Sequence, residues 1–291
     1  MKEITIKAEQ SNQRLDKFIK RYMNDAPNSF IYKMLRKKNI VLNGKRAEGS
    51  EILSEGDIIK LFLSDDTING FTKQRDYKTG KLDIIYEDDD MAVLNKPPNL
   101  LTQPDTKNGD SLITRFIATR PNLDFAPVCI SRLDRNTSGI VLCAKNLHTA
   151  QKLSQMMKEG NIKKYYIAIV KGNVKNPVIL KDFHQKDKQN NKVIITKEKT
   201  ESSKEIITEI YPIKYNPKTN TTALKIKLIT GKTHQIRAHL AYINHPIIGD
   251  IKYGKGSKGS RQLLHAYEVH LLGKTFVAPL PSDMRGLYDG Y

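Results

Sequence analysis

A short polar segment around Asp134 has the residue types that chemistry needs; it reads Arg132-Leu133-Asp134-Arg135. Two arginines flank the carboxyl group, and nearby positive charge lowers the pKa of an acid. We therefore expect an ionised carboxylate that can act as a nucleophile or base. The apolar residues 140–143 follow, which predicts a loop ahead of a buried strand. By itself this pattern fits a structural ion pair at a strand start better than an active site.

Two further segments contain candidate partners for this carboxylate. Residues 164–172 are typical of a strand with Tyr166 near its start, although a tyrosine in a strand usually belongs to the core. In residues 228–239 a strand breaks at Gly231 and a helix follows. Arg237 falls one turn into that helix, where the helix dipole disfavours a cation. A carboxylate partner would explain its position.

Other candidate motifs fail on spacing. Residues 231–233, Gly-Lys-Thr, resemble the end of a phosphate-binding loop, but that motif needs a glycine where Ile226 stands. A nucleophile elbow needs glycines two residues before and two residues after the serine, and Ser138 has Asn136 and Ile140 there. His234 and His239 are five residues apart, which separates them by about 140° around a helix. We therefore expect no metal site.

The charge of the whole chain indicates a polyanionic partner. Its 291 residues carry a formal net charge of +18, with 38% hydrophobic and 27% charged residues. This composition supports a packed core, and the length suggests about two domains. Phosphate contacts with lysine and arginine release counterions, so we favour nucleic acid over a membrane surface, which would need a basic amphipathic helix.

The predicted compartment is the cytoplasm. Cys129 and Cys143 lie in apolar surroundings, which suits free thiols under reducing conditions. No apolar run approaches the ~18 residues of a membrane span, and the first residues lack the apolar core of a signal peptide. We therefore expect no membrane partner.

Basic residues concentrate in the first part of the chain. Residues 14–46 contain ten lysines and arginines against two acids. Apolar spacing predicts a helix around residues 15–22, a second helix with Asn28 or Ser29 as its N-cap, and a strand at residues 40–42. One or two cations would suit a helix C-terminus, but ten favour a nucleic-acid surface.

The remaining pattern predicts an α+β fold. Residues 65–80 are polar and rich in turn formers, so we expect a linker between a first domain at residues 12–64 and a second at residues 81–291. Residues 182–192 are almost wholly polar, which suggests a protruding hairpin loop. Strands without regular alternation with helices favour a mixed, mostly antiparallel sheet. The predicted strands are residues 83–86, 91–94, 140–143, 166–170, 206–211 and 223–228, and the predicted helices are residues 112–118, 148–157 and 234–242.

The first domain resembles a small α/β RNA-binding domain of the S4 type. The resemblance rests on residues 13–18, 31–37 and 40–46. It implies that the domain binds structured RNA, and it says nothing about chemistry. The RNA contacts that we expect from it are Arg14, Arg36, Lys37, Lys38, Lys45 and Arg46.

The segments around Asp134, Tyr166 and Arg237, taken together, resemble the RluA-type pseudouridine synthase family. The match spans residues 82–282 in the expected order. With the S4-like domain, the chain is similar to the branch that acts on large-subunit ribosomal RNA, and residues 28–32 favour its C-type member. The family's opening and closing segments fit residues 86–89, 94–98, 262–266 and 276–281.

The resemblance implies an isomerisation in which uracil leaves ribose at N1 and is reattached through C5, without a cofactor or metal. Asp134 attacks the sugar or assists glycosidic cleavage, and Arg237 pairs with it. Tyr166 sits against the base as a candidate proton acceptor. Arg132 fills the gap left by a flipped nucleotide. The further RNA contacts that the resemblance implies are Lys164, Thr230, Lys232 and His234.

Three positions depart from the residues frequent in the family: Ser131 replaces a histidine, Asn99 a glycine and Lys232 an arginine. They bear on the target and on backbone contacts, not on the class of reaction. The expected partner of this chain, which we expect to be a monomer, is 23S ribosomal RNA, free or in an assembling large subunit. Transfer RNA is the alternative substrate, and a non-catalytic RNA-binding protein with a degenerate enzyme fold is the other alternative.

Overall fold

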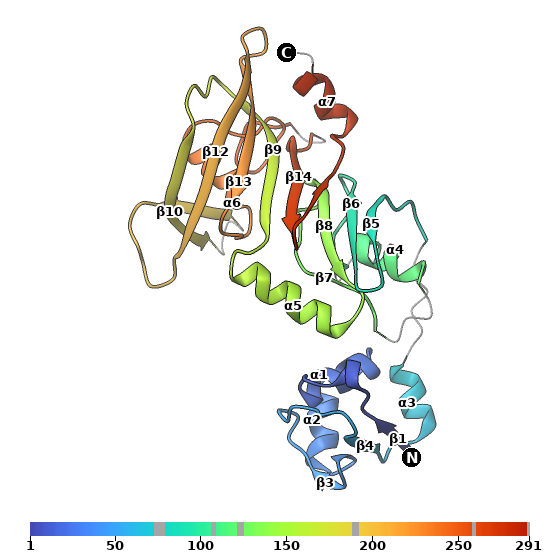
Figure 1. Cartoon of the computed structure of the whole chain (residues 1–291). Coiled ribbons are helices and arrows are strands. Elements are labelled where there is room, and N and C mark those ends of the chain that lie inside the picture. The colour runs from blue at the N-terminus through green and yellow to red at the C-terminus, as the bar shows by residue number, and fades with distance from the viewer. Residues whose placement is uncertain (73–78, 106–108, 121–124, 188–191, 258–259, 290–291) are drawn as a thin grey trace. The chain divides into compact units, whose positions relative to one another are not determined.

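The computed structural model describes residues 1–72, 79–105, 109–120, 125–187, 192–257 and 260–289. The chain divides into two units, residues 1–76 and 77–291 (Figure 1). Each unit has its own hydrophobic core. In the described parts of the chain, no helix is both long enough and apolar enough to cross a membrane.

The first unit packs two helices against a small sheet. Its elements are β1 (Lys2–Thr5), η1 (Ala8–Gln10), α1 (Leu15–Tyr22), α2 (Asn28–Arg36), β2 (Ile40–Leu42), β3 (Lys45–Arg46), β4 (Ile58–Leu61) and α3 (Asp65–Phe71). The strands lie in the order β1-β4-β2-β3, with antiparallel neighbours. Leu15, Phe18 and Ile19 of α1 pack with Ile31 and Leu35 of α2, so the apolar spacing in the sequence is the spacing of the buried faces.

The segment predicted as a linker, residues 65–80, begins with the helix α3. Ser64 caps this helix by accepting a hydrogen bond from the amide of Thr67, and Ile68 is buried in the core of the first unit. The linker prediction was wrong for this helix, because a single fully buried residue in two turns leaves little apolar pattern. Residues 73–78, which the prediction also included, lie outside the described residues.

The start of the first unit also differs from the prediction. A domain beginning at residue 12 would leave out β1, which pairs with β4 over four residues, and Ile6, which is buried. Helix α2 begins at Asn28 with Pro27 as its N-cap, so the predicted cap at Asn28 or Ser29 was wrong. The fixed φ of proline is compatible with this entry into a helix.

The second unit is built on one mixed sheet. Its strands are β5 (Ile84–Glu87), β6 (Met91–Lys96), β7 (Val128–Cys129), β8 (Ser138–Ala144), β9 (Lys163–Lys171), β10 (Val178–Asp187), β11 (Lys192–Thr196), β12 (Lys204–Asn216), β13 (Thr221–Leu228), β14 (Leu264–Leu271) and β15 (Lys274–Val277). The helices are α4 (Leu112–Ala118), α5 (Leu147–Lys158), α6 (Gln235–Tyr242) and α7 (Ser282–Asp289). The strand order is β11-β10-β12-β13-β9-β14-β8-β6-β5, with β15 beside β14 and β7 beside β8. The pair β14–β8 is parallel and the other pairs are antiparallel, so the predicted α+β class is confirmed.

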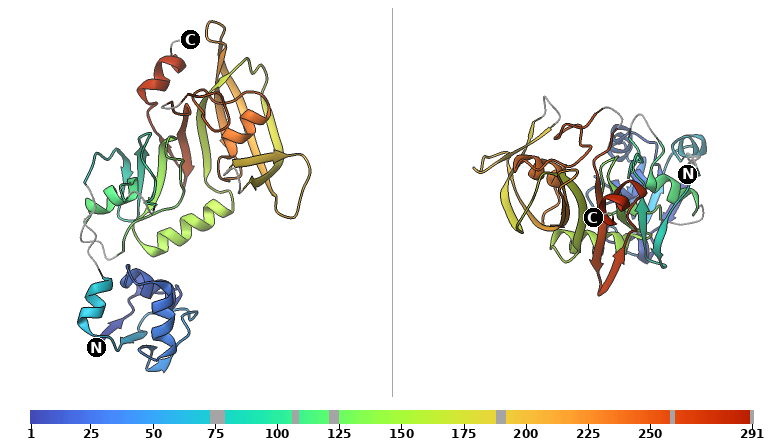
Figure 2. Two further views of the ribbon diagram at one scale, coloured as in Figure 1. Left: turned by 180° about the vertical axis from the view of Figure 1, so that it is seen from behind. Right: turned by 90° about the horizontal axis from the view of Figure 1, so that it is seen from above.

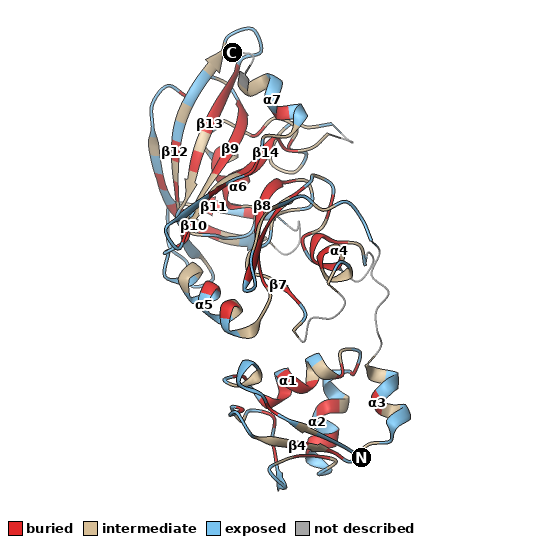
Figure 3. Ribbon diagram, turned by 45° about the vertical axis from the view of Figure 1, so that its right-hand side comes forward, coloured by how far each residue is buried: buried red, intermediate tan, exposed pale blue. Residues whose placement is uncertain are grey.

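Helices cover both faces of the strand that follows Asp134. Along β8, Ile140 and Leu142 share a core cluster with Leu153 of α5, whereas Val141 shares another with Phe116 of α4. This alternation is the two-residue period of a strand buried on both faces, and every residue of β8 is buried (Figure 3). Helix α6 packs against β11 and β12, toward the other end of the sheet (Figure 2).

The strand β10 occupies much of the segment predicted as a polar hairpin loop, residues 182–192. Asp182 and His184 are buried within this strand. The prediction was wrong there, because a polar side chain can be buried when distant residues bond to it, and polarity alone does not reveal such partners. Residues 188–191 lie outside the described residues.

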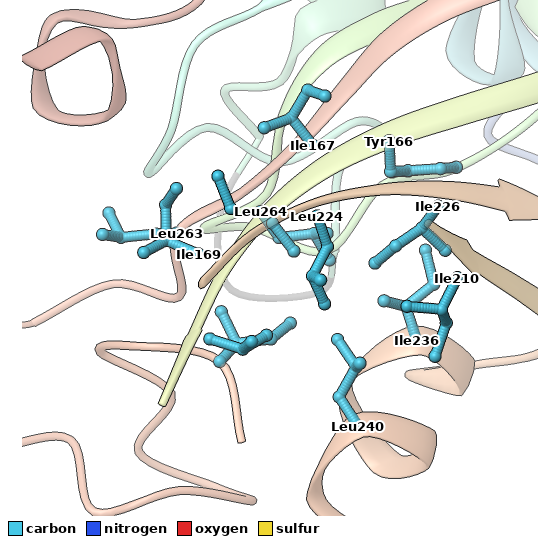
Figure 4. Close-up of a cluster of buried hydrophobic side chains, with 14 of the residues drawn as sticks. Tyr166, Ile167, Ile169, Ile210, Leu224, Ile226, Ile236, Leu240, Leu263 and Leu264 are labelled. Carbon is cyan, nitrogen blue, oxygen red and sulfur yellow. The ribbon is translucent and has the colours of Figure 1, made fainter. Parts of the chain in front are cut away.

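A row of residues crosses the sheet at the level of the predicted site. Ile210, Ile226, Tyr166, Ala266 and Gly139 are successive cross-strand partners on β12, β13, β9, β14 and β8. Figure 4 shows the first three near one another in the core. Gly139 has a φ of +107°, and a Cβ there would clash with the carbonyl oxygen of Ala266. The missing side chain lets β8 approach β14, the strand that lies between β8 and the strand of Tyr166.

Candidate active site

Asp134 lies in the loop that enters β8, and backbone hydrogen bonds hold this loop. The amide of Thr137 donates to the carbonyl oxygen of Asp134 at 3.0 Å, which closes a turn. Lys96, fully buried at the end of β6, donates to the carbonyl oxygen of Arg135 at 2.9 Å and to two carbonyl oxygens of the turn after β6. Burial lowers the pKa of Lys96 to about 7, and the nearby carboxylate of Asp134 opposes that shift.

A second basic residue holds the same loop from the other side. Arg261 donates from Nη1 to the carbonyl oxygen of Asn136 at 3.1 Å, and it also forms an ion pair with Asp283 of α7. The loop is therefore fixed through its backbone by residues from two different elements. This arrangement leaves the side chain of Asp134 available to the site.

Arg237 connects Asp134 to a buried acid. Its Nη1 donates to Oδ2 of Asp134 at 2.7 Å, while Nε and Nη2 donate to the two oxygens of Asp250 at 2.8 and 3.0 Å. The side chains of Arg237 and Asp250 are 9% and 0% exposed, whereas that of Asp134 is 28% exposed. A bidentate pair inside the protein thus holds the guanidinium, which presents a remaining N–H to the accessible carboxylate. The contact expected between Arg237 and Asp134 is present.

The charges in this cluster outweigh the cost of burial. Burial alone would lower the pKa of Arg237, but the hydrogen bonds and charges of Asp250 and Asp134 raise it above its ordinary value. Burial would raise the pKa of Asp250, but Arg237 and the amides of Lys252 and Tyr253, which donate to Oδ1 at 2.9 and 3.1 Å, lower it. Arg237 and Asp250 are therefore both charged at neutral pH.

The arginines that flank Asp134 do not form the ion pair expected from the sequence. Arg132 is exposed and makes no hydrogen bond or ion pair with the described residues, and Arg135 donates to Oδ1 of Asn99 at 3.0 Å. Neighbouring side chains of a non-helical segment tend to point in different directions, so adjacency in sequence does not create a contact. The ionic partner of Asp134 comes instead from α6, 103 residues along the chain.

Tyr166 lies on β9 and is 9% exposed. Burial, and then the negative charge of Asp134, raise the pKa of its hydroxyl above the ordinary value of 10.0. The hydroxyl is therefore neutral at physiological pH, so a phenolate is not ready to take a proton. The ring remains suited to lie against a base, and the hydroxyl to take part in hydrogen bonds.

The other residues expected to contact RNA in the second unit differ in how available their side chains are to RNA. Lys164 is half-buried, which lowers its pKa, and it lines a small cavity together with Tyr166. Lys232 is exposed. The hydroxyl of Thr230 donates to Gln235 at 3.0 Å and accepts from an amide of β12 at 2.9 Å. Thr230 therefore shapes the turn before α6 and has no free hydroxyl donor for RNA.

His234 lies beside the carboxylate of Asp134. It is the residue before α6, and its backbone is left-handed, with φ 54° and ψ 17°. Its Nδ1 is 3.0 Å from the hydroxyl of Tyr253, and its Nε2 is 3.8 Å from Oδ2 of Asp134. Burial lowers the pKa of His234, against the attraction of Asp134, so the imidazole is neutral at pH 7.

Asp250 and Tyr253 are site residues to which the sequence analysis assigned no role. Asp250 anchors Arg237, and the ring of Tyr253 lies 5.2 Å from the guanidinium of the same arginine. A signal was available in Arg237 itself, because a cation among the apolar residues of a helix requires a buried anion. Within the described residues, no group of three or more His, Cys, Asp or Glu is arranged to hold a metal ion.

The basic residues expected to bind RNA on the first unit fall into two groups. Arg14 forms an ion pair with the buried Asp16 at 3.0 Å, and Tyr32 donates to the same carboxylate at 2.7 Å. The other five are exposed, and their side chains make no hydrogen bond or ion pair with the described residues: Arg36, Lys37, Lys38, Lys45 and Arg46. These five cations are free to meet an anion.

The fold and the Asp134 cluster agree with what comparison with known proteins finds. The family model for RNA pseudouridylate synthases matches residues 90–242, which include Asp134, Tyr166 and Arg237. An uncharacterized RNA pseudouridine synthase of Mycoplasma genitalium is 31% identical over 284 residues, which covers 93% of this chain and 88% of the relative. The ribosomal large subunit pseudouridine synthase C of Haemophilus ducreyi is 32% identical over 283 residues, with 91% and 86% covered.

This chain therefore belongs to the RNA pseudouridylate synthase family, and the resemblance to its RluA type is confirmed. It is an isomerase. The solved structure of human RNA pseudouridylate synthase domain containing 1 has a TM-score of 0.60 at 22% identity, and the match covers 73% of this chain and 89% of that one. At this identity the likeness concerns the fold alone.

Proposed function

We propose that this chain converts uridine to pseudouridine in large-subunit ribosomal RNA, with Asp134 acting on the ribose of the target nucleotide. The observation that carries the proposal is the sharing of Arg237 between two acids. Asp250 is fully buried, whereas Asp134 is accessible. A substrate can reach only an accessible acid, and the buried Asp250 serves to hold Arg237. The reactive acid of this family enzyme is therefore Asp134.

The reaction is balanced within one nucleotide. The bond between N1 of uracil and C1′ of ribose breaks, and a bond between C5 and C1′ forms. The proton on C5 leaves to solvent, and N1 ends with a proton. Oδ2 of Asp134 is engaged by Arg237, whereas no hydrogen bond from the described residues reaches Oδ1. Oδ1 is thus the atom that assists departure of the base, or that bonds to C1′ as N1 leaves and is released again when C5 bonds to C1′.

Different residues contact the flipped base and fill the gap that it leaves in the stack of bases. The target must leave its stack, at a cost of a few kcal/mol that contacts with RNA supply. Tyr166 lies against the flipped base as a neutral ring, and the exposed Arg132 occupies the space that the nucleotide leaves. Lys164 and Lys232 contact phosphates beside the site.

The first unit supplies affinity. The five predicted RNA contacts whose side chains are unpaired fit phosphate groups, and its small sheet with two helices is compatible with the S4-like fold that the sequence resembles. We assign no chemical step to this unit. We propose further that the chain works as a cytoplasmic monomer.

The choice of ribosomal RNA rests on the relative from Haemophilus ducreyi, whose name specifies the large subunit. Carbodiimide-dependent primer extension tests it on ribosomal and transfer RNA from a strain that lacks this protein, before and after incubation with it. New stops in 23S RNA are expected. Stops confined to transfer RNA would contradict the proposed target, and no new stop in either pool would contradict the proposed function.

A further inference from the structure

We propose that Tyr253 is a positioning residue that fixes His234 as the tautomer with hydrogen on Nε2, and that this N–H is presented beside Asp134 to an oxygen of the target nucleotide. The inference rests on the proposed function, because it assigns the N–H to the substrate of that reaction. It also makes a claim about the free protein, which can be tested without RNA.

The hydrogen bonds of the Tyr253 hydroxyl indicate whether it donates to Nδ1 of His234 or accepts from it. The backbone amide of Val193 donates to the hydroxyl oxygen at 3.0 Å. The second partner of the hydroxyl among the described residues is Nδ1 of His234, also at 3.0 Å. Since the hydroxyl oxygen already accepts, its own hydrogen is free to go to Nδ1. Nδ1 is then the acceptor, and Nε2 of the neutral ring carries the hydrogen.

This leaves a hydrogen-bond donor at the reaction centre that has no partner among the residues that the structure describes. Nε2 of His234 is 3.8 Å from Oδ2 of Asp134, which is too long for a hydrogen bond. Oδ2 is instead bonded to Arg237. The side chain of His234 is 18% exposed, so a bound nucleotide can reach it. A ribose or base oxygen lying against Asp134 is the acceptor that fits this place.

The backbone conformation of His234 indicates that the surrounding structure holds this residue in place. Its backbone is left-handed, a conformation that non-glycine residues rarely adopt and that persists where surrounding contacts impose it. Its side chain makes no helix-capping hydrogen bond. It meets the ring of Tyr253 edge-on, with centroids 5.6 Å apart. The conformation therefore directs the imidazole toward Tyr253 and Asp134.

Tyr253 is also well placed to align the neighbouring groups. Its amide donates to Asp250 at 3.1 Å, and its ring lies over the guanidinium of Arg237. One residue thus contacts both the anchor of the arginine and the histidine. Tyr253→Phe keeps the ring over Arg237 and removes the hydroxyl, so it isolates the tautomer effect.

The first test is ¹⁵N NMR of the full chain labelled at histidine, with His234 assigned by the signals lost in His234→Gly. In the wild type we expect an unprotonated Nδ1 and a protonated Nε2. In Tyr253→Phe both signals should move toward the average of two exchanging tautomers. Tyr211→Phe is the matched control, because its hydroxyl bonds to Glu209 on the surface, and it should leave the pattern unchanged.

The second test is the single-turnover release of tritium from 5-tritiated ribosomal RNA. We expect Tyr253→Phe to slow release about ten-fold, which matches the loss of one neutral hydrogen bond, with RNA affinity unchanged. His234→Gly relieves the backbone conformation but lacks the donor, so it should be slower still. His234→Gln, whose amide can place an N–H near the same point, should recover part of the rate.

A wild-type spectrum with hydrogen on Nδ1 would overturn the proposal, and so would a Tyr253→Phe variant with an unchanged spectrum or an unchanged rate. The wild-type spectrum alone decides the tautomer if Tyr253→Phe does not fold. An inactive wild-type protein with the expected nitrogen pattern would refute the proposed substrate while upholding the tautomer.

Discussion

Arg237 is shared between two acids, and replacing each acid with an amide separates structure from chemistry. Asp250→Asn keeps the shape of the side chain, but it removes the charge and turns one of the two acceptors that face Arg237 into a donor. Because Arg237 is 9% exposed, its charge would stay buried with Asp134 as its remaining acidic partner. Asp134→Asn leaves the bidentate pair with Asp250 intact.

The loss of unfolding free energy should therefore be several-fold larger for one variant than for the other. We expect Asp250→Asn to lower the free energy of unfolding by about 3–5 kcal/mol, the usual cost of removing one partner of a buried ion pair. Asp134→Asn should cost about 1 kcal/mol, because the carboxylate is 28% exposed and its bond to Arg237 is partly replaced by solvent. The order of activity is the reverse: Asp134→Asn should abolish catalysis, whereas folded Asp250→Asn keeps part of it.

Urea unfolding followed by circular dichroism measures these differences, with the transition of each unit fitted separately. The matched control is Asp110→Asn. Asp110 makes the same bidentate pair with Arg115, but the two side chains are 27% and 21% exposed, so we expect a loss of about 1 kcal/mol or less. A loss for Asp250→Asn no larger than that of the control would refute the reasoning about burial.

Three further predictions concern the sheet, a buried histidine and the first unit. Gly139→Ala should lower the unfolding free energy by roughly 3 kcal/mol and slow tritium release, while Gly273→Ala, at a positive φ of +74° in open space, should cost about 1 kcal/mol. Burial lowers the pKa of His265 to about 4 from 6.5, so the unfolded chain binds a proton that the folded chain excludes. The free energy of unfolding should therefore fall as the pH drops from about 6.5 to about 4, and in His265→Gln it should depend less steeply on pH across that range. Deletion of residues 1–72 should weaken RNA binding about ten-fold or more in filter-binding titrations, with little change in the single-turnover rate at saturating RNA; an equal loss in both would count against separate roles for the units.

The elements with strong periodicity were predictable from the sequence. Helix α4 coincides with the predicted residues 112–118, and the apolar run at residues 140–143 is the buried strand β8. β10 was not predictable, because its buried Asp182 is compensated by contacts with Lys197 and His239 that no local pattern reveals. Helix α3 was missed for the opposite reason, since it buries too little to leave a pattern.

The residues of the candidate site also fall into those that the sequence reveals and those that only the structure reveals. Asp134, Tyr166 and Arg237 are found by motif and by the unusual place of a cation in a helix, and the structure brings Asp134 and Arg237 into contact. Asp250 and Tyr253 become visible only in three dimensions, because their importance lies in bonds to other elements. The flanking arginines were the wrong place to look for the ionic partner of Asp134, because the direction of side chains in space, and not their adjacency in the sequence, decides an ion pair.

The central claim is that Asp134 carries out the isomerisation. The most direct measurement is tritium release from 5-tritiated large-subunit ribosomal RNA by the wild type and by Asp134→Asn under single-turnover conditions, with folding of both checked by circular dichroism. We predict complete release by the wild type and none above background by the variant. Full activity of a folded Asp134→Asn protein would contradict the account.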